Sequence, residues 1–170
     1  MTRQKLYSLD ELARRLSQLK AQGKKIVLAN GCFDLIHVGH IRYLREAKAR
    51  GDILVVALNS DSSIRQLKGS GRPLLEESER AEIIASFEFV DFVTIFDALT
   101  VEHVLRRLQP HVHAKGSDYT QETVPEKDTA RAIKAEIAIT GGPKVRSTSE
   151  IIKEIKKNLK SLQERHFQDN

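Results

Sequence analysis

Short apolar runs alternate along this chain with longer segments in which apolar residues recur every three or four positions. The apolar runs, which predict strands, lie at residues 26–29, 53–58, 92–96, 112–114 and 137–139. The periodic segments, which predict helices, lie at residues 9–22, 41–50, 76–88, 100–108 and 129–135, with a shorter helix ending at Leu67. Strands that alternate with helices across short loops are typical of a parallel sheet covered on both faces. We therefore expect an α/β fold with a doubly wound, five-stranded parallel sheet.

Both ends of the chain carry further predicted helices. In the N-terminal segment, residues 1–24, Ser8 and Glu11 have the spacing of a capping box and Gly23 is placed to end the helix. In the C-terminal segment, residues 149–165, isoleucines and leucines share one face and lysines the other. We expect this amphipathic helix to pack on the sheet or on a second subunit, as in a homodimer. A membrane-surface helix is disfavoured, because the segment is short and lacks aromatic anchors.

Composition narrows the class of protein. The length of 170 residues predicts a single domain spanning residues 1–170. No apolar run approaches the ~20 residues that span a bilayer, and no apolar segment follows the N-terminus as in a secretory signal. The chain has one cysteine, Cys32, which allows no intrachain disulfide and fits a reducing compartment. We therefore expect a cytoplasmic protein, and the lack of a long apolar run predicts no membrane partner. The net charge of +5 suits anionic partners, but three Tyr, six Phe and no Trp do not favour nucleic-acid binding.

The run from Asn30 to His40, which directly follows the first predicted strand, carries the strongest chemical signal. A strand, a tight turn and a helix start together place unpaired backbone N–H groups and two imidazoles, His37 and His40, at one spot. The missing side chain of Gly39 lets a ligand approach closely. This arrangement suits an anion such as a polyphosphate.

This run resembles the signature of the nucleotidyltransferase superfamily that carries a His-x-Gly-His motif. Because Gly31, Cys32, Phe33 and Asp34 directly precede the motif, the alternative of two surface histidines on an ordinary turn is disfavoured. The resemblance implies a Rossmann-like nucleotidyltransferase fold. There is no P-loop or dinucleotide-binding glycine pattern, and no Cys/His cluster predicts a metal site.

One subgroup of this superfamily, the heptose 1-phosphate adenylyltransferases, is similar over most of the chain. The matching pieces are Asn59-Ser60-Asp61, Leu67-Lys68-Gly69, Arg72-Pro73, Glu79-Arg80 and, most discriminating, Lys115-Gly116-Ser117-Asp118-Tyr119. The resemblance implies that ATP and D-glycero-D-manno-heptose 1-phosphate react, with Mg²⁺, to ADP-heptose and pyrophosphate. The product would feed lipopolysaccharide or a surface-layer glycan of bacteria. No sugar-kinase domain is present, so we expect the monofunctional form.

Site residues follow from the pattern and the resemblance together. We assign His37 and His40 to the triphosphate and Lys68 to a mobile cation, a solvated surface lysine being the alternative. The resemblance implies that ATP contacts Cys32, Phe33, His37, His40, Ser147, Thr148 and Ser149. We expect Gly31 and Gly39 to bind the nucleotide as well. The residues expected at the sugar phosphate are Asp34, Asp61, Arg72, Arg80, Lys115, Gly116, Asp118 and Tyr119.

Several alternatives stay open. Arg80 can instead form a helix-surface salt bridge with Glu76 or Glu77, and residues 147–149 can form a plain helix N-cap. Cys32 is interpreted as a small residue beside the phosphate loop, with nucleophilic catalysis as the minority hypothesis. The run Arg146 to Ser149 is a reduced form of the cytidylyltransferase pattern, which leaves ATP over CTP less certain than the reaction type. A glycerol- or ethanolamine-phosphate cytidylyltransferase is therefore the first alternative hypothesis. A non-catalytic nucleotide sensor is the second.

Overall fold

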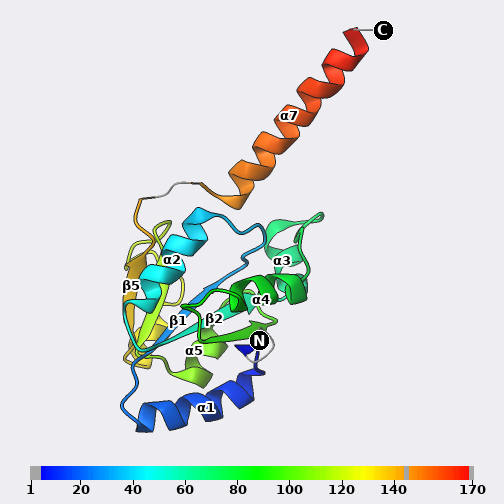
Figure 1. The fold of residues 1–170 in the computed structure, drawn as a ribbon. Helices are drawn as coiled ribbons and strands as arrows, with labels where there is room; N and C mark the ends of the chain where they lie inside the picture. Colours follow the sequence, from blue (N-terminus) through cyan, green and yellow to red (C-terminus); the bar gives the residue numbers. More distant parts are fainter. Residues whose placement is uncertain (1–4, 144–145, 169–170) are drawn as a thin grey trace.

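The computed structural model describes residues 5–143 and 146–168 of the chain. Five parallel strands form one sheet in the order β3-β2-β1-β4-β5 (Figure 1). Their bounds are β1 Ile26–Gly31, β2 Ile53–Asn59, β3 Phe92–Phe96, β4 Val112–Gly116 and β5 Glu136–Thr140. The predicted doubly wound, five-stranded parallel sheet is confirmed.

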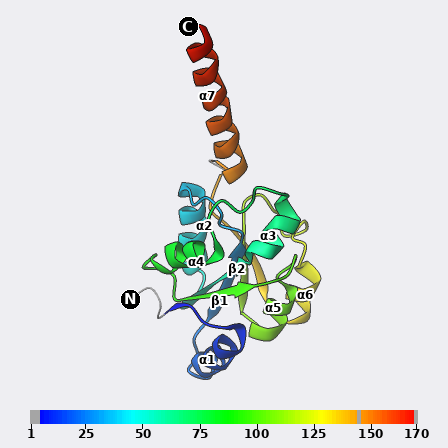
Figure 2. The same ribbon diagram turned by 90° about the vertical axis from the view of Figure 1, so that its right-hand side faces the viewer.

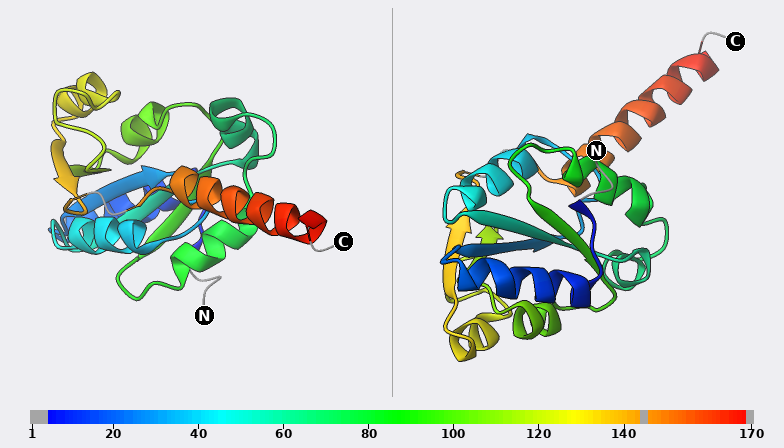
Figure 3. Two further views of the ribbon diagram at one scale, coloured as in Figure 1. Left: turned by 90° about the horizontal axis from the view of Figure 1, so that it is seen from above. Right: turned by 60° about the horizontal axis from the view of Figure 1, so that its bottom comes forward.

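Helices cover both faces of this sheet, as Figure 3 shows from two directions. Their bounds are α1 Leu9–Ala21, α2 Val38–Lys48, α3 Asp61–Lys68, α4 Glu77–Ala85, α5 Glu102–Leu108, α6 Lys127–Ala132 and α7 Thr148–Gln168. Side chains of α2 and α4 complete one apolar core cluster, and side chains of α1 and α5 complete the other. The two clusters meet opposite faces of the same strands, which is why the strands read as continuous apolar runs.

The central strand β1 shows how this arrangement orients polar side chains. Val27 and Ala29 lie in the cluster with α2 and α4, while Ile26 and Leu28 lie in the cluster with α1 and α5. Because side chains alternate along a strand, the polar residues at its carboxyl end also divide between the two faces. The sheet order reverses direction between β1 and β4. A crevice for ligands is expected at this switch point, beyond the carboxyl ends of both strands.

The N-terminal helix follows its sequence signals. The Ser8 hydroxyl accepts a hydrogen bond from the Glu11 backbone N–H, and the Glu11 carboxylate accepts one from the Ser8 N–H. The predicted capping box is confirmed, and Gly23 takes a left-handed conformation (φ 79°) just past the helix end. Leu12 and Leu16 anchor α1 in the core.

The C-terminal helix α7 projects away from the rest of the molecule (Figures 1 and 2). Its start is held by the Thr148 hydroxyl, which donates to the Leu35 carbonyl at 3.1 Å. Ile155, Leu159 and Leu162 are 49%, 56% and 51% exposed. The prediction that this helix packs on the sheet is therefore wrong, because the other helices already cover both faces of the sheet. No helix in the described part of the chain is long and apolar enough to cross a bilayer.

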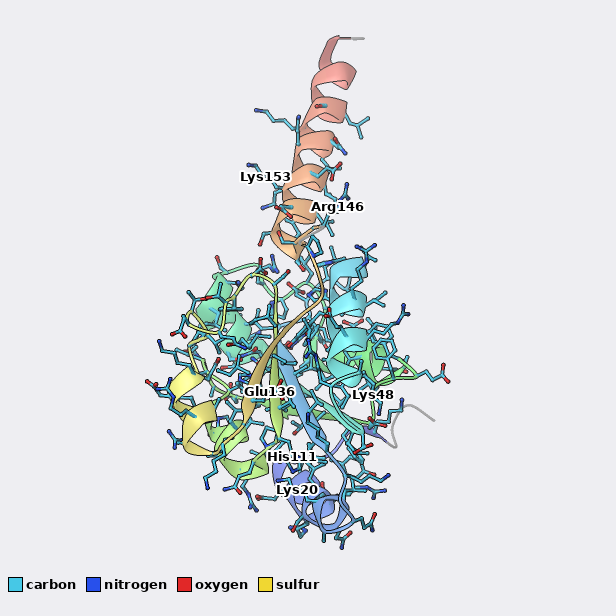
Figure 4. All side chains as sticks on the ribbon, turned by 90° about the vertical axis from the view of Figure 1, so that its left-hand side faces the viewer. Lys20, Lys48, His111, Glu136, Arg146 and Lys153 are labelled. Atoms are coloured by element: carbon cyan, nitrogen blue, oxygen red, sulfur yellow. The ribbon has the colours of Figure 1, made fainter. Side chains whose placement is uncertain are left out.

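Different segments of the chain lie at the two ends of the sheet. Lys20 and His111 lie at the amino end of β1, where Nδ1 of His111 accepts a hydrogen bond from the Ile26 N–H at 2.9 Å (Figure 4). Arg146 and Lys153 lie at the opposite end, at the start of α7 (Figure 4). His111 thus has a structural role, in agreement with its lack of any sequence motif.

Candidate active site

A cavity of about 510 Å³ lies at the carboxyl ends of the strands. Its volume falls in the range of small-molecule sites. The predicted site residues that line it are Gly31, Cys32, Phe33, Asp34, His37, Gly39, His40, Lys68, Arg72, Lys115, Gly116, Asp118, Tyr119, Ser147, Thr148 and Ser149. The loops that the sequence placed after separate strands therefore converge on one site.

His37 and His40 form one wall of this cavity, at the first turn of α2. The helix begins at Val38, three residues earlier than predicted, so His37 is its N-cap. Nδ1 of His37 accepts from the Gly39 N–H at 3.1 Å, and Nδ1 of His40 accepts from the His37 N–H at 3.4 Å. The two rings lie 3.9 Å apart between centroids. We call this pair, with Gly39, the phosphate wall.

These hydrogen bonds decide which ring nitrogen carries the proton. A nitrogen that accepts a hydrogen bond is unprotonated, so each neutral ring holds its proton on Nε2. Burial, followed by the neighbouring His37, lowers the pKa of His40 to about 4. Burial also lowers the pKa of His37, although Glu150 and Asp118 act in the opposite direction. Both rings are therefore neutral N–H donors near pH 7.

Gly39 also makes room for a side chain of the protein itself. A Cβ at this position would lie 2.9 Å from both Cε1 and Nδ1 of His37. The absence of a side chain at Gly39 thus leaves room for the imidazole of His37. The position of the His37 ring depends directly on this absence.

The loop between β1 and α2 is held in a strained form by packing. Phe33 has φ 47°, a left-handed conformation that is rare for a bulky residue. Its ring is buried, stacks on Tyr43 and contacts the ring of His40 at 5.1 Å between centroids. A Cβ on Gly31 would approach the Phe33 ring to 3.0 Å. Phe33 therefore positions His40, and its side chain has little surface left for a nucleotide.

The thiol of Cys32 has no activated character. Burial raises its pKa, and this effect is larger than the opposing effects of Lys68 and Arg80. Sγ lies 3.9 Å from Oδ1 of Asn59. A protonated thiol is a weak nucleophile. The geometry thus favours a small lining residue over a catalytic cysteine.

Asp34 lines the cavity, but its carboxylate is occupied by the protein. It forms an ion pair with Nε of Arg72 and accepts from the backbone N–H groups of Leu74 and Leu75 at 2.6 and 3.2 Å. The Asp34 side chain is 1% exposed and that of Arg72 is 16% exposed. Asp34 therefore fixes the loop that presents Arg72 at the cavity edge.

Arg80 and Asp61 lie outside the cavity, in contrast to the prediction. The Arg80 guanidinium is fully buried and pairs with Asp61 at 2.7 Å. It also donates to the carbonyls of Cys32 at 2.6 Å and Asn59 at 2.9 Å. With its donors turned toward the carboxyl ends of β1 and β2, it is not available to a substrate phosphate. The alternative of a surface salt bridge with Glu76 or Glu77 is also wrong.

The remaining cations lie around the mouth of the cavity. Lys68 is the exposed last residue of α3, and it lines the cavity. Ser147 and Glu150 form an N-cap for α7: the Ser147 hydroxyl accepts from the Glu150 N–H at 3.2 Å. The alternative of an N-cap is thus present, and Arg146 beside it lines the cavity as well.

Another part of the cavity lining comes from β4 and the turn after it. The Tyr119 N–H donates to the Gly116 carbonyl at 3.1 Å, which brings Asp118 and Tyr119 to the cavity. Nζ of Lys115 lies 4.7 Å from the centre of the Tyr119 ring. Lys115 itself is 5% exposed and pairs with Glu126 at 3.2 Å. Only a small part of this lysine reaches the cavity.

Several lining residues were not among the predicted site residues, among them the polar residues Asn30, Glu126 and Arg146. Asn30 opens the signature run and Arg146 precedes the Ser147 cluster, so their neighbours gave an available signal. Glu126 gave none, because only the fold brings the residue before α6 against β4.

Comparisons with known proteins agree with this geometry. Residues 28–165 match the cytidylyltransferase-like family model. The bifunctional protein HldE of Geobacter metallireducens is 48% identical over 151 residues, which cover 89% of this chain and 31% of that protein. The bifunctional protein HldE of Aliarcobacter butzleri is 42% identical over 153 residues, 90% of this chain and 31% of that protein. The chain thus spans about a third of the length of these relatives.

Solved structures show the same fold. A lipopolysaccharide core biosynthesis protein from Thermoplasma volcanium aligns with a TM-score of 0.62 at 27% identity, covering 72% of this chain and all of that one. A pantoate-beta-alanine ligase from Francisella tularensis aligns with a TM-score of 0.62 at 16% identity, covering 85% of this chain and 68% of that one. The second likeness concerns the fold alone. Together with the family match over most of the chain, the strand order and the histidine pair, these findings show that the chain belongs to the cytidylyltransferase-like family of nucleotidyltransferases.

Proposed function

We propose that this protein transfers the adenylyl group of ATP to D-glycero-D-manno-heptose 1-phosphate, giving ADP-heptose and pyrophosphate. HldE proteins combine a heptose 7-phosphate kinase with a heptose 1-phosphate adenylyltransferase. The turn Lys115 to Tyr119, which carries the subgroup resemblance, borders the same cavity as the phosphate wall. The observation that carries the proposal is this shared cavity, which is lined both by the two neutral imidazole donors and by the turn.

The reaction needs alignment and charge stabilisation more than a protein nucleophile. A phosphate oxygen of the sugar phosphate attacks the α-phosphorus of ATP and forms a new P–O bond. The bond from that phosphorus to the bridging oxygen breaks, and pyrophosphate leaves with the electron pair. Nε2–H of His37 and of His40 donate to phosphate oxygens that gain charge. Lys68 and Arg146 lie at the mouth of the cavity, where they can stabilise the leaving group.

We propose Mg²⁺ as the accompanying ion. Among residues 5–143 and 146–168, no group of three His, Cys, Asp or Glu side chains gathers as a metal cage. The Asp34 carboxylate is occupied by Arg72 and by backbone N–H groups. This donor set fits Mg²⁺ held mainly by triphosphate oxygens and water. When bound, the ion neutralises part of the triphosphate charge.

The assignment is tested by pyrophosphate release with four nucleoside triphosphates against a panel of phosphates. The panel contains heptose 1-phosphate, glycerol 3-phosphate and ethanolamine phosphate. We expect turnover with ATP and heptose 1-phosphate. Turnover with CTP alone contradicts the adenylyl assignment and favours a cytidylyltransferase. Nucleotide binding without turnover of any pair identifies a sensor.

We propose that the protein forms a homodimer through α7. Ile152, Ile155, Leu159 and Leu162 are spaced three, four and three residues apart, the pattern of a coiled-coil seam. The last three are about half exposed. Sedimentation equilibrium should show a dimer that Leu159→Asp dissociates. Lys157→Asp, on the polar face of the same helix, is the matched control and should remain dimeric; a monomeric native protein contradicts the proposal.

We also propose a cytoplasmic location and, apart from the second subunit, small-molecule partners only. ATP is a cytoplasmic substrate, and a single free cysteine, Cys32, fits a reducing compartment. Fractionation of cells that produce the protein tests the location. Recovery with the membrane fraction contradicts it.

A further inference from the structure

Four polar side chains meet under the cavity at the switch point between β1 and β4. They are Asn30, His113, Lys115 and Glu126, and we call them the switch-point cluster. The last three are 0%, 5% and 4% exposed, whereas Asn30 is partly exposed and lines the cavity. Buried polar side chains are costly unless they pair, so a cluster of this kind at a ligand site points to a role there.

The strands place three of these residues on one face of the sheet. Ala29 of β1 is level with Ala114 of β4. The next residues, Asn30 and Lys115, therefore lie side by side, and His113 is on the same side as Lys115. Glu126 comes from the residue before α6 and reaches the Lys115 ammonium at 3.2 Å.

These contacts fix the orientation of the Asn30 amide. Oδ1 of Asn30 lies 3.0 Å from Nε2 of His113 and 3.5 Å from Nζ of Lys115. An ammonium group only donates, so the atom that faces both partners must be the acceptor oxygen. Nε2 of His113 is then a donor as well. The NH₂ group of Asn30 therefore lies on the side of the amide that does not face this pair, and Asn30 lines the cavity.

His113 is suited to hold the amide in place. Burial, followed by the neighbouring Lys115, lowers the pKa of His113 to about 3, so the ring is neutral near pH 7. Nδ1 of His113 is buried and makes no hydrogen bond within the described part of the chain. The ring therefore has one polar contact, and that contact is to Asn30.

The chemistry of this side of the cavity suits an uncharged, hydroxyl-bearing group. Lys115 is neutralised by Glu126, and Asn30 carries no charge. Asp118 and Tyr119, from the turn after β4, also line the cavity. Phosphate groups are better served by Lys68, Arg146 and the phosphate wall.

We propose that Asn30 is a specificity-determining residue whose NH₂ group donates to a hydroxyl oxygen of the sugar phosphate. His113, Lys115 and Glu126 are positioning residues that hold this amide. The inference rests on the proposed function, and it adds a residue that recognises the sugar. A site built to donate to a hydroxyl group disfavours substrates that lack that group.

The test is steady-state kinetics of the full chain with ATP and heptose 1-phosphate. Asn30→Ala should raise the KM for heptose 1-phosphate about tenfold, the effect of one lost hydrogen bond, with the KM for ATP unchanged within about twofold. Asn30→Asp keeps the acceptor for His113 and Lys115 and loses both donors. It should fold as the native protein does and raise the same KM several-fold.

The positioning role has its own readout. His113→Phe should raise the KM for heptose 1-phosphate about as much as Asn30→Ala, because the amide loses its fixed orientation. His113→Gln keeps a donor in a similar place and should restore most of the difference. His103→Gln, on the exposed side of α5, is the control and should change neither constant.

The outcomes separate this inference from the proposed function. An unchanged KM for heptose 1-phosphate in both Asn30 variants, or a rise in the KM for ATP alone, overturns the role of Asn30. If the native protein uses glycerol 3-phosphate in place of the heptose, the proposed function fails, and the variants are then compared on glycerol 3-phosphate. Turnover of ethanolamine phosphate alone, which has no free hydroxyl group, overturns both.

Discussion

The phosphate wall is held in place by backbone groups close in sequence, whereas the switch-point cluster is held by side chains far apart in sequence. His37 and His40 accept from N–H groups no more than three residues away. Asn30 contacts residues 83 and 85 positions along the chain. The phosphate wall can therefore lose a side chain without loss of the fold. In the switch-point cluster, removal of one side chain leaves its buried polar partner without a contact.

The largest expected effect comes from Lys115→Met, which leaves the Glu126 carboxylate buried without its partner. The two side chains are 7% and 5% exposed, and loss of one member of such a pair costs about 3–5 kcal/mol of unfolding free energy. Urea denaturation measures it. Lys48→Met breaks the more exposed ion pair with Asp91, in which each side chain is 29% exposed, and is expected to cost about 1 kcal/mol or less.

A double variant sharpens this contrast. Lys115→Met with Glu126→Gln removes the unpaired charge and should recover most of the lost stability. If Lys115→Met costs no more than Lys48→Met, the buried pair does not hold the cluster together.

His40→Ala should strongly reduce turnover and only slightly reduce stability, the reverse of what is expected for the buried ion pair. Loss of one preorganised donor reduces turnover about 10²–10³-fold, or about 3–4 kcal/mol of barrier. The unfolding free energy should fall by only about 1 kcal/mol, because the ring is held by a single backbone hydrogen bond and ring contacts. An equally large loss of stability would give His40 a role in the scaffold instead. His103→Ala serves as the control on an exposed histidine.

Acid should lower the unfolding free energy through one histidine of the phosphate wall and one of the switch-point cluster. The pKa of His40 is about 4 in the folded protein, against an ordinary value of 6.5, so the unfolded chain takes up its proton first as the pH falls. The unfolding free energy therefore decreases below about pH 6.5, by about 2 kcal/mol at pH 5 from this residue. His113, with a pKa of about 3, acts in the same direction. Urea denaturation at about pH 7.5 and about pH 5 should show smaller acid losses in His40→Ala and in His113→Gln than in the native protein.

The same contrast explains what the sequence could predict. The strand pattern, the capping box of Ser8 and the motif around Gly39 depend on neighbours within a few residues, and they are visible in the sequence. The position of Arg80 could not be predicted from the sequence, because its guanidinium donates to carbonyls that are 48 and 21 residues away. Glu126 gave no signal for the same reason. The direction of α7 depends on which faces of the sheet other helices had already covered.

The smallest expected effect is the loss of turnover in Gly39→Ala, which tests whether catalysis depends on where the His37 ring lies. Gly39 lies in the first turn of α2 with ordinary backbone angles, so alanine should leave the helix as stable or stabilise it by up to about 1 kcal/mol. The added methyl group would lie 2.9 Å from the His37 ring and displace it, which should reduce turnover about tenfold. In a His37→Ala background the same substitution has no ring to displace, and it should cost less than twofold. Equal losses in both backgrounds would show that Gly39 acts on the ligand directly, as the sequence alone suggested, and that the phosphate wall does not depend on the fit between these two residues.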